Sequence, residues 1–442
     1  MTAIEKITPA NAANLVDTER GLASRRIFTD EDLFELEMER IFTRSWVFVG
    51  LESEIPEPGD YVTRNMGTDP VIMVRDNDGT IGVFHNSCPH RGVMICQADQ
   101  GRVKGFVCAY HGWSFNLDGS HAASFHPKEF YRGGVPFDEL GLHKVAQIET
   151  YAGLVFATWN KELGSLEETI TESSRWYLDM LFNRTPGGME VLGPPQRWMA
   201  DQNWKLGAIN FCGDGPHAPT LHGLIAQQVG ESPEQFMTAV QGDSPDITIA
   251  PGQNMLLNLT PSEETPFIGY PPELVELYKE KLDEQQFNFI GRLMTSVGTL
   301  FPHFTFTQLP VRFSENEPPA NFTMIRVWQP ISASRTEVWN WFLVEKEAPE
   351  AFKVASLKAG LRSFSAGGTF DQDDAEGWAA TTRGIQGPIG RSLDLNFQTT
   401  LGWRDDMWDE FPGPGKTAPN MFTEITEFEY LTEWKKWIGG ES

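Results

Sequence analysis

Two short motifs, each with one cysteine and one histidine, constrain this chain more than any other feature. Each motif also ends in a glycine: Cys88, His90 and Gly92 form the first, and Cys108, His111 and Gly112 form the second. The chain has only four cysteines in all, which argues against a disulfide framework in a protein of this length. The thiols of the two motifs are therefore available as metal ligands.

Two kinds of metal group could use these four side chains. A single tetrahedral zinc ion accepts two cysteines and two histidines, and it is the simpler alternative. Zinc fingers, however, usually pair cysteine with cysteine and histidine with histidine, whereas each motif here mixes the two. A mixed motif suits a cluster with two different irons, because each motif can send its cysteine to one iron and its histidine to the other. We therefore expect a [2Fe–2S] cluster of the Rieske type, bound by Cys88, His90, Cys108 and His111.

Composition narrows the class of protein. The chain has 442 residues and a formal charge of −26, from 35 Lys and Arg against 61 Asp and Glu. This balance argues against nucleic-acid binding, since phosphate contacts need clustered basic residues. We find no apolar run of about 18 residues and no basic, then apolar, leader. We expect a soluble cytoplasmic protein with no membrane partner.

The order of helical and strand patterns along the sequence predicts an α+β fold in more than one domain. Residues 29–42 have the pattern of a helix, and we assign 1–39 to an N-terminal helical segment that packs with a catalytic domain. Short β runs with Gly turns fill 40–162, the small all-β Rieske domain, where 76–80 marks a hairpin turn. Residues 163–442 alternate helical patterns with long strands, so we expect a larger catalytic domain with an antiparallel sheet and surrounding helices.

A second candidate metal site lies between residues 201 and 223. Asp214 and His217 are three apart and share a face of a helical turn, so Asp214 could fix the tautomer of His217. His217 and His222 are five apart and would diverge by about 140° on a regular helix. Pro219 lies between them, so they can converge only if the backbone is irregular there. Taken alone, the two histidines are as typical of core or surface positions as of ligands.

A site of two histidines and one carboxylate, typical of non-haem Fe(II), needs one more oxygen ligand. The candidate segment is Phe370–Trp378, which contains three aspartates and a glutamate. The simpler interpretation of such an acidic run is a solvated loop.

Together these motifs closely resemble the large (α) subunits of Rieske non-haem iron, aromatic-ring-hydroxylating dioxygenases. The resemblance covers nearly the whole chain. It includes ERIFTRSWVFVG and IPEPGDYV before the two cysteine–histidine motifs, NWK at 203–205, the pattern NFCGD…H…H at 210–222, and RSFSAGGTFDQDD at 362–374.

The resemblance implies roles for individual residues. Imidazole ligands of a mononuclear iron fall on His217 and His222, and the carboxylate ligand falls on the second Asp of the acidic motif, Asp374. Asp214 matches the residue that bridges the two metal centres, where it would link His217 to His111 of a neighbouring subunit. Asn210 matches a residue near the iron, and Phe364 matches an aromatic residue of the substrate pocket.

Three positions depart from the family pattern. Pro216 replaces the Tyr that many members have before the first iron histidine, Ile209 replaces a Glu, and Gly377 replaces an Asn. None of these changes removes a ligand.

The resemblance also implies the activity and the partners. We expect a terminal oxygenase that inserts both atoms of O2 into an aromatic ring to give a cis-dihydrodiol. Its electrons would come from NAD(P)H through a separate ferredoxin, a reductase or both, since no strand leads into a dinucleotide fingerprint here. A small β subunit in an α3β3 assembly, or α3 alone, is the expected oligomer. The alternatives are a Rieske monooxygenase or demethylase and, in another class, a protein that only carries electrons. The substrate stays open between an apolar aromatic and an aromatic acid.

Overall fold

The computed structural model describes residues 6–132, 134–223, 245–260, 266–312, 316–402, 407, 411–418 and 420–440, and every structural statement below concerns these residues. Contacts divide the chain into two compact units. The smaller unit is Phe42–Leu166, and the larger unit combines Met1–Ile41 with Glu167–Ser442. Within the described ranges, no helix has both the length and the apolar character that a membrane crossing requires.

The smaller unit consists of short antiparallel strands in three sheets. The four-stranded sheet has the order β6-β5-β4-β7, and the two three-stranded sheets have the orders β11-β12-β3 and β10-β9-β8. The strands are β3 (Val47–Leu51), β4 (Asp60–Met66), β5 (Asp69–Arg75), β6 (Ile81–His85), β7 (Gln100–Arg102), β8 (Phe106–Val107), β9 (Ser114–Phe115), β10 (His121–Ala123), β11 (Gln147–Tyr151) and β12 (Leu154–Thr158). A short helix, α2, covers Pro127–Tyr131. The hairpin predicted at 76–80 is confirmed, because β5 and β6 pair up to Arg75 and Ile81.

The core of this unit contains the two cysteines of the sequence motifs. Cys88 and Cys108 belong to the same buried cluster as Phe84, Phe106 and Trp113. Burial of these rings ties the loops that carry the motifs to the sheets, since apolar burial is the main driving force for packing.

The larger unit is built on a nine-stranded antiparallel sheet. Its order is β13-β20-β19-β18-β17-β16-β15-β22, and β14 also pairs with β20. The strands are β13 (Met189–Val191), β14 (Gln196–Ala200), β15 (Asp246–Ala250), β16 (Gln253–Leu259), β17 (Leu293–Leu300), β18 (Phe304–Val311), β19 (Ala320–Ser332), β20 (Arg335–Glu345) and β22 (Lys416–Ala418). A small separate sheet joins β1 (Val16–Asp17), β2 (Leu22–Ser24) and β21 (Asp394–Asn396).

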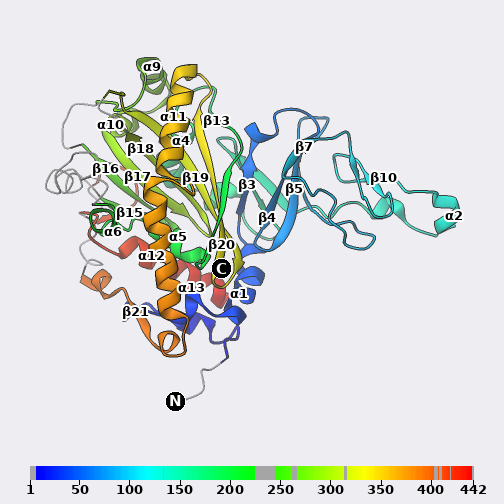
Figure 1. Cartoon of the computed structure of the whole chain (residues 1–442), viewed down its shortest axis with the longest axis horizontal. Coiled ribbons are helices and arrows are strands. Elements are labelled where there is room, and N and C mark those ends of the chain that lie inside the picture. Colours follow the sequence, from blue (N-terminus) through cyan, green and yellow to red (C-terminus); the bar gives the residue numbers. More distant parts are fainter. Residues whose placement is uncertain are drawn as a thin grey trace. The chain divides into compact units, whose positions relative to one another are not determined.

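Helices pack around this sheet (Figure 1). They are α1 (Glu31–Glu37), α3 (Leu166–Thr169), α4 (Glu172–Phe182), α5 (Trp204–Asn210), α6 (His217–Leu221), α9 (Pro272–Lys281), α10 (Glu284–Arg292), α11 (Glu350–Ser363), α12 (Thr369–Ile385) and α13 (Ile425–Gly439). Helix α11 packs on β19 and β20, and α13 packs on β15 and β16. The predicted α+β architecture, with an all-β part and an antiparallel sheet with helices, is confirmed.

Capping side chains set where several helices begin. Asp30 caps α1, so the predicted helix at 29–42 begins at Glu31, and a π-helical turn at Met38–Phe42 follows it. Residues 272–292 form two helices, because the Asp283 side chain accepts a hydrogen bond from the Gln286 backbone and starts α10 there. The Thr171 hydroxyl likewise caps α4 and separates it from α3.

A buried ion pair connects the N-terminal segment with the rest of the larger unit. The Glu37 carboxylate of α1 accepts hydrogen bonds from Lys205 Nζ (2.6 Å), Trp204 Nε1 (3.0 Å) and Trp434 Nε1 (2.8 Å). The two charged side chains are at most 1% exposed. Three helices, α1, α5 and α13, are therefore joined at one carboxylate, and α5 leads directly to Asn210.

We expect this ion pair to be costly to break from one side. The substitution Glu37→Ala leaves the Lys205 ammonium buried without its partner, which should lower the free energy of unfolding of the larger unit by about 3–5 kcal/mol. Urea titration followed by tryptophan fluorescence measures the change. The matched control is Lys358→Ala, because Lys358 and Glu317 are about half exposed, at 50% and 48%. That change should cost less than about 1 kcal/mol. Equal shifts for the two variants would contradict the assignment.

Candidate functional site

The two cysteine–histidine motifs form loops of the same backbone pattern. In each loop the cysteine N–H donates to the carbonyl five residues later, and the glycine N–H four residues later donates back to the cysteine carbonyl. The four N···O distances are between 2.7 and 3.0 Å. Gly92 has a φ of 76° and Gly112 a φ of 69°, a left-handed conformation that favours glycine. The glycines that end the motifs are therefore required by the turn.

These loops bring the four candidate ligands of the smaller unit together. The Cys88 and Cys108 side chains are buried, and the His90 and His111 rings are 4.6 Å apart between centroids. The His90 ring also stacks on Trp113, with 4.9 Å between centroids. Burial raises the pKa of the Cys88 thiol. Among the described residues, the buried Nδ1 atom of His90 has no hydrogen-bond partner. Buried sulfur and nitrogen atoms in this state fit ligands to a metal group.

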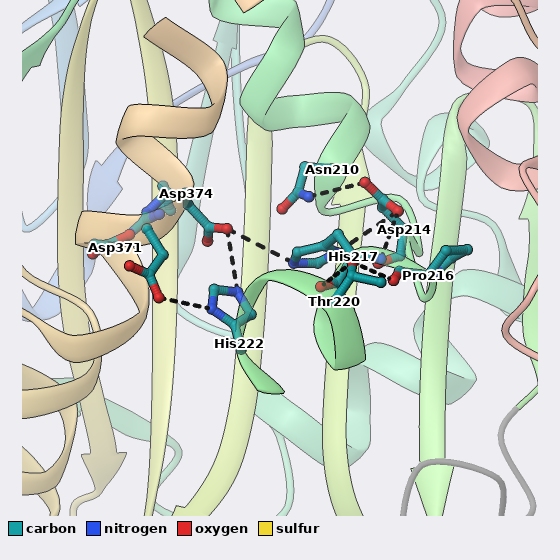
Figure 2. A network of polar contacts seen from close by, with 10 residues as sticks. Asn210, Asp214, Pro216, His217, Thr220, His222, Asp371 and Asp374 are labelled. Atoms are coloured by element: carbon teal, nitrogen blue, oxygen red, sulfur yellow. Dashed lines mark hydrogen bonds and ion pairs between the residues drawn. The ribbon is translucent and has the colours of Figure 1, made fainter. Parts of the chain in front are cut away.

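His217, His222 and Asp374 converge in the larger unit, as the sequence predicted for a second metal site. Asp374 Oδ1 lies 3.2 Å from His222 Nε2 and 3.8 Å from His217 Nε2. The two imidazole rings are 5.1 Å apart between centroids and nearly perpendicular, at 78°. Figure 2 shows the Asp374 carboxylate pointing toward both rings from the opposite helix. Two imidazole nitrogens and one carboxylate oxygen are the ligand set of a non-haem Fe(II) site.

Local backbone geometry explains how residues five apart can meet. His217 is the first residue of α6, and His222 lies just beyond its end, with φ −94° and ψ 0°. Pro219 lies inside this five-residue helix, and the His222 N–H still donates to the carbonyl of Ala218 over 3.1 Å. The departure from helical geometry therefore comes at His222, and not at Pro219, where it was expected.

The acidic segment is a helix and not a solvated loop, so that simpler interpretation is wrong. Asp371 and Asp374 both lie in α12 and are buried. They are three apart and therefore share the inner face of the helix. The Asp373 side chain, in contrast, is 44% exposed, against 4% for Asp374. Asp374 is thus the buried carboxylate that faces both histidines, whereas the exposed Asp373 has its Oδ2 4.0 Å from Nδ1 of His222.

The contacts of His217 orient its imidazole. Nδ1 contacts the backbone carbonyl of Asp214, which can only accept a hydrogen bond, so Nδ1 carries the proton. Nε2 is left without a proton and faces Asp374. We expected the Asp214 side chain to fix the tautomer of His217, but its Oδ1 lies 3.7 Å from Nδ1. Burial lowers the pKa of His217, yet Asp214 and then Asp374 outweigh burial, and the pKa is raised. Greater basicity favours donation to a metal.

Asn210 and Asp214 form the edge of this site. Asn210, the last residue of α5, donates from Nδ2 to Asp214 Oδ2 over 3.2 Å. Burial opposes ionisation of Asp214, but its hydrogen bonds to His217 and Asn210 keep its pKa below the ordinary value. Two buried carboxyl groups that were not predicted from the sequence, Asp246 and Glu427, interact electrostatically with Asp214. Burial, with the nearby charge of Asp214, raises the pKa of both well above the ordinary range.

Apolar side chains line the other flank of the three residues. The Phe370 ring meets His222 edge-on at 5.3 Å and stacks on Phe364 at 5.4 Å. Phe364, the predicted pocket residue, is 8% exposed. A small apolar cluster includes the residue next to His217 in the chain: Leu256 and Met421, with Ala218 and Val297 packed against them.

Arg326 is a residue of this region that sequence analysis missed. It lies on β19, is fully buried, and donates from Nη2 to Asp371 Oδ2 over 2.6 Å. Burial raises the pKa of Asp371 to about 6, although the Arg326 charge acts in the opposite direction. The one available signal was that Arg326 is the only charged residue of its strand, ANFTMIRVWQPIS.

Comparison with known proteins agrees with this geometry. Residues 45–132 match the family described as the Rieske [2Fe-2S] domain. Residues 168–399 match the ring hydroxylating alpha subunit, catalytic domain. The two matches confirm the predicted pairing of an iron–sulfur domain with a non-haem iron domain in one chain.

Relatives and solved structures extend the likeness over nearly the full chain. The alpha subunit of biphenyl dioxygenase from Paraburkholderia xenovorans (strain LB400) is 36% identical, over 92% of this chain and 89% of that protein. The alpha subunit of an N,N-dimethyl phenylurea N-demethylase from Sphingobium sp. (strain YBL2) is 32% identical, over 95% and 92%.

Among solved structures, naphthalene 1,2-dioxygenase from Rhodococcus sp. bound to indole superposes with a TM-score of 0.91. It shares 32% identity, and the match covers 98% of each chain. On the family matches and these full-length relatives, the chain belongs to the family of ring-hydroxylating dioxygenase alpha subunits.

Proposed function

We propose that this chain is the terminal oxygenase component that inserts both atoms of O2 into an apolar aromatic ring, giving a cis-dihydrodiol. One observation carries the proposal. His217, His222 and Asp374, drawn from two helices, converge within 4.8 Å in a chain that also has a Rieske domain. A protein that only carried electrons would have no use for this second set of ligands.

We infer that each chain binds two iron groups. Cys88, His90, Cys108 and His111 would hold the [2Fe–2S] cluster, with both cysteines on one iron and both histidines on the other. His217, His222 and Asp374 would hold a mononuclear Fe(II), which supplies the activation of O2 when bound. The fit is supported by Asp374 Oδ1, which is buried and has no hydrogen-bond partner among the described residues. A carboxylate oxygen in that state requires a cation.

The residues around the iron would orient its ligands and connect the iron to the cluster. Asp214 holds His217 through the backbone contact at Nδ1, and Asn210 holds the Asp214 side chain. The Asp214 side chain is 34% exposed, so it can still meet another protein surface. We infer that it meets His111 of a neighbouring copy and so links the two centres.

The substrate class follows from the side chains beside the iron ligands. Phe364, Phe370 and the apolar group Leu256, Met421, Ala218 and Val297 favour an uncharged aromatic ring. An aromatic acid would need a free cation. Arg326, which lies beside the site, is paired with Asp371 through Nη2, although its buried Nη1 has no hydrogen-bond partner among the described residues.

The partners are proposed from the relatives, which are named as alpha subunits. We infer a small β subunit in an α3β3 assembly, with α3 as the alternative. A ferredoxin, a reductase or both would relay electrons from NAD(P)H, one at a time, to the cluster.

One relative is an N-demethylase, so monooxygenation is the second candidate activity. In that reaction only one oxygen atom of O2 enters the product. Incubation under ¹⁸O₂ with an apolar aromatic, such as biphenyl or naphthalene, and with surrogate carriers separates the two. We expect a product that contains two ¹⁸O atoms, because both oxygens would come from one O2. Mass spectrometry of the product measures this. A single label in every product would exclude dioxygenation and favour the monooxygenase alternative.

We expect Asp374 to be essential and an exposed acidic residue of the same helix to be dispensable. The substitution Asp374→Ala removes a predicted ligand, so product formation should fall by more than the 10–100-fold typical of an outer-shell change. The visible spectrum of the cluster should not change. The control is Glu376→Ala, in the same helix but 71% exposed and paired with Arg383, which should lose less than about tenfold. Product assays and iron analysis measure both variants. Retained activity in Asp374→Ala would show that the carboxylate ligand is another residue.

The cluster ligands can be tested by counting iron and sulfide. We expect about three iron atoms and about two acid-labile sulfides per chain, from one Rieske cluster and one mononuclear site. His111→Ala should lose the visible absorption and about two of the irons, and keep the third. Cys96→Ala is the control, since this buried cysteine lies outside both motifs, and it should keep the full count. A colourless wild-type protein containing zinc would overturn the cluster assignment.

A further inference from the structure

Arg326 carries its positive charge in the protein interior, where a charge is energetically unfavourable. The residue lies on β19, in the middle of the sheet, and its side chain is 0% exposed. A buried guanidinium is tolerated only if charged or polar partners replace the water that it has lost. The partners of Arg326 therefore show what its position depends on.

Two partners hold the guanidinium from two directions. Nη2 donates to Asp371 Oδ2 in the first turn of α12, and Nε donates to Asn340 Oδ1 on β20, each over 2.6 Å. Asn340 is directly opposite Arg326 in the β19–β20 ladder, so this contact is fixed by strand register. Asn340 Nδ2 then donates to the carbonyl of Phe364, over 3.0 Å. The sheet thus orients the guanidinium, and the guanidinium fixes the start of α12.

Aromatic rings enclose the same group. The guanidinium carbon lies between 5.0 and 5.5 Å from the centroids of four rings, Trp198, Phe211, Trp328 and Phe364. Trp328 in turn packs edge-on against Trp378 of α12, at 5.1 Å. Rings around a cation attract it and also prevent it from moving.

Asp371 and Asp374 occupy the same face of α12, one turn apart. A shift or rotation of the first turn of the helix would therefore move the carboxylate of Asp374 relative to His217 and His222. Metal ligands must lie within a few tenths of an ångström of their proper distances. The position of this turn therefore determines whether the three ligand atoms can bind one ion.

We propose that Arg326 is a positioning residue for the mononuclear iron site. Through Asp371 it fixes the first turn of α12, and so it sets where Asp374 presents its carboxylate to the two histidines. This inference rests on the proposed iron site. It assigns no contact with iron or substrate to Arg326 itself.

The larger unit offers a matched control for the test. Arg184 is also a buried guanidinium, 2% exposed, and its Nε donates to a buried carboxylate, Glu345 on β20, over 2.5 Å. Its other partners include Gln308 and Thr323, and none of these is a residue of the site. Arg184 and Arg326 thus share burial, charge and kind of partner, and differ in what they hold.

The experiment compares Arg326→Lys with Arg184→Lys in the full chain with its Rieske cluster present. Lysine keeps the charge but cannot reach two acceptors as the planar guanidinium does. After removal of the mononuclear iron, Fe(II) is titrated back, and its dissociation constant is measured. We expect Arg326→Lys to bind Fe(II) at least about tenfold more weakly than wild type, as for other outer-shell changes. Arg184→Lys should stay within about twofold, although both variants should lose similar stability to urea.

A second signal reports the geometry of the ligands directly. The EPR spectrum of the nitric oxide complex of the iron should change in Arg326→Lys and not in Arg184→Lys, while the cluster spectrum stays constant in both. Equal Fe(II) affinity and equal spectra in the two variants would overturn the inference. If Arg326→Lys does not fold, Asp371→Asn and Glu345→Gln form the same comparison with the same criterion. Wild type that binds no iron at this site, or Asp374→Ala that binds it normally, would overturn the proposed function instead.

Discussion

The arrangement of this site depends on one buried carboxylate oxygen. Asp374 Oδ1 faces the Nε2 atoms of His217 and His222 and has no hydrogen-bond partner among the described residues. An uncompensated charge of this kind costs several kcal/mol, so the oxygen requires either a protonated imidazole or a metal cation. Nδ1 of His217 donates its proton to a backbone carbonyl, so Nε2 of the same ring has no proton and is an acceptor. An acceptor at this position favours a metal cation over a protonated imidazole. The short helix α6, the inner face of α12 and the contact with Asp214 all help to place the nitrogen atoms around this oxygen.

The two proposed metal sites are built in opposite ways, and this decides what a sequence can reveal. Each loop of the smaller unit is closed by hydrogen bonds that span at most five residues, with a left-handed glycine at a fixed place. Ligand identity, spacing and turn are therefore all local. The proposed iron site of the larger unit needs residues about 150 positions apart to meet. No local rule could join the segment with His217 to the segment with Asp374, and only the resemblance to a family did so.

The same distinction explains the errors and the omissions. Long alternating strands and their antiparallel pairing are visible as period-two patterns, so β18 to β20 could be predicted. The acidic run at 370–378 has the composition of a solvated loop. It becomes an inward-facing helix because Arg326, from a distant strand, neutralises Asp371. Likewise, no pattern could place Asp246 and Glu427 beside Asp214, because their proximity arises from the packing of α13 on β15. Charges inside a protein depend on tertiary partners, and those partners cannot be read from composition.

Three buried ion pairs occupy structurally decisive positions in the larger unit: Glu37 with Lys205, Arg184 with Glu345, and Arg326 with Asp371. Such pairs contribute little net stability, since desolvation offsets most of the attraction. Here they fix the relative orientation of the helices and strands that carry them. Apolar contacts are non-directional, whereas a guanidinium and a carboxylate bind best in one relative placement. A metal site tolerates displacements of only a few tenths of an ångström. A helix that carries a ligand therefore needs an anchor with a direction, and the anchor of α12 is the ion pair one turn before Asp374.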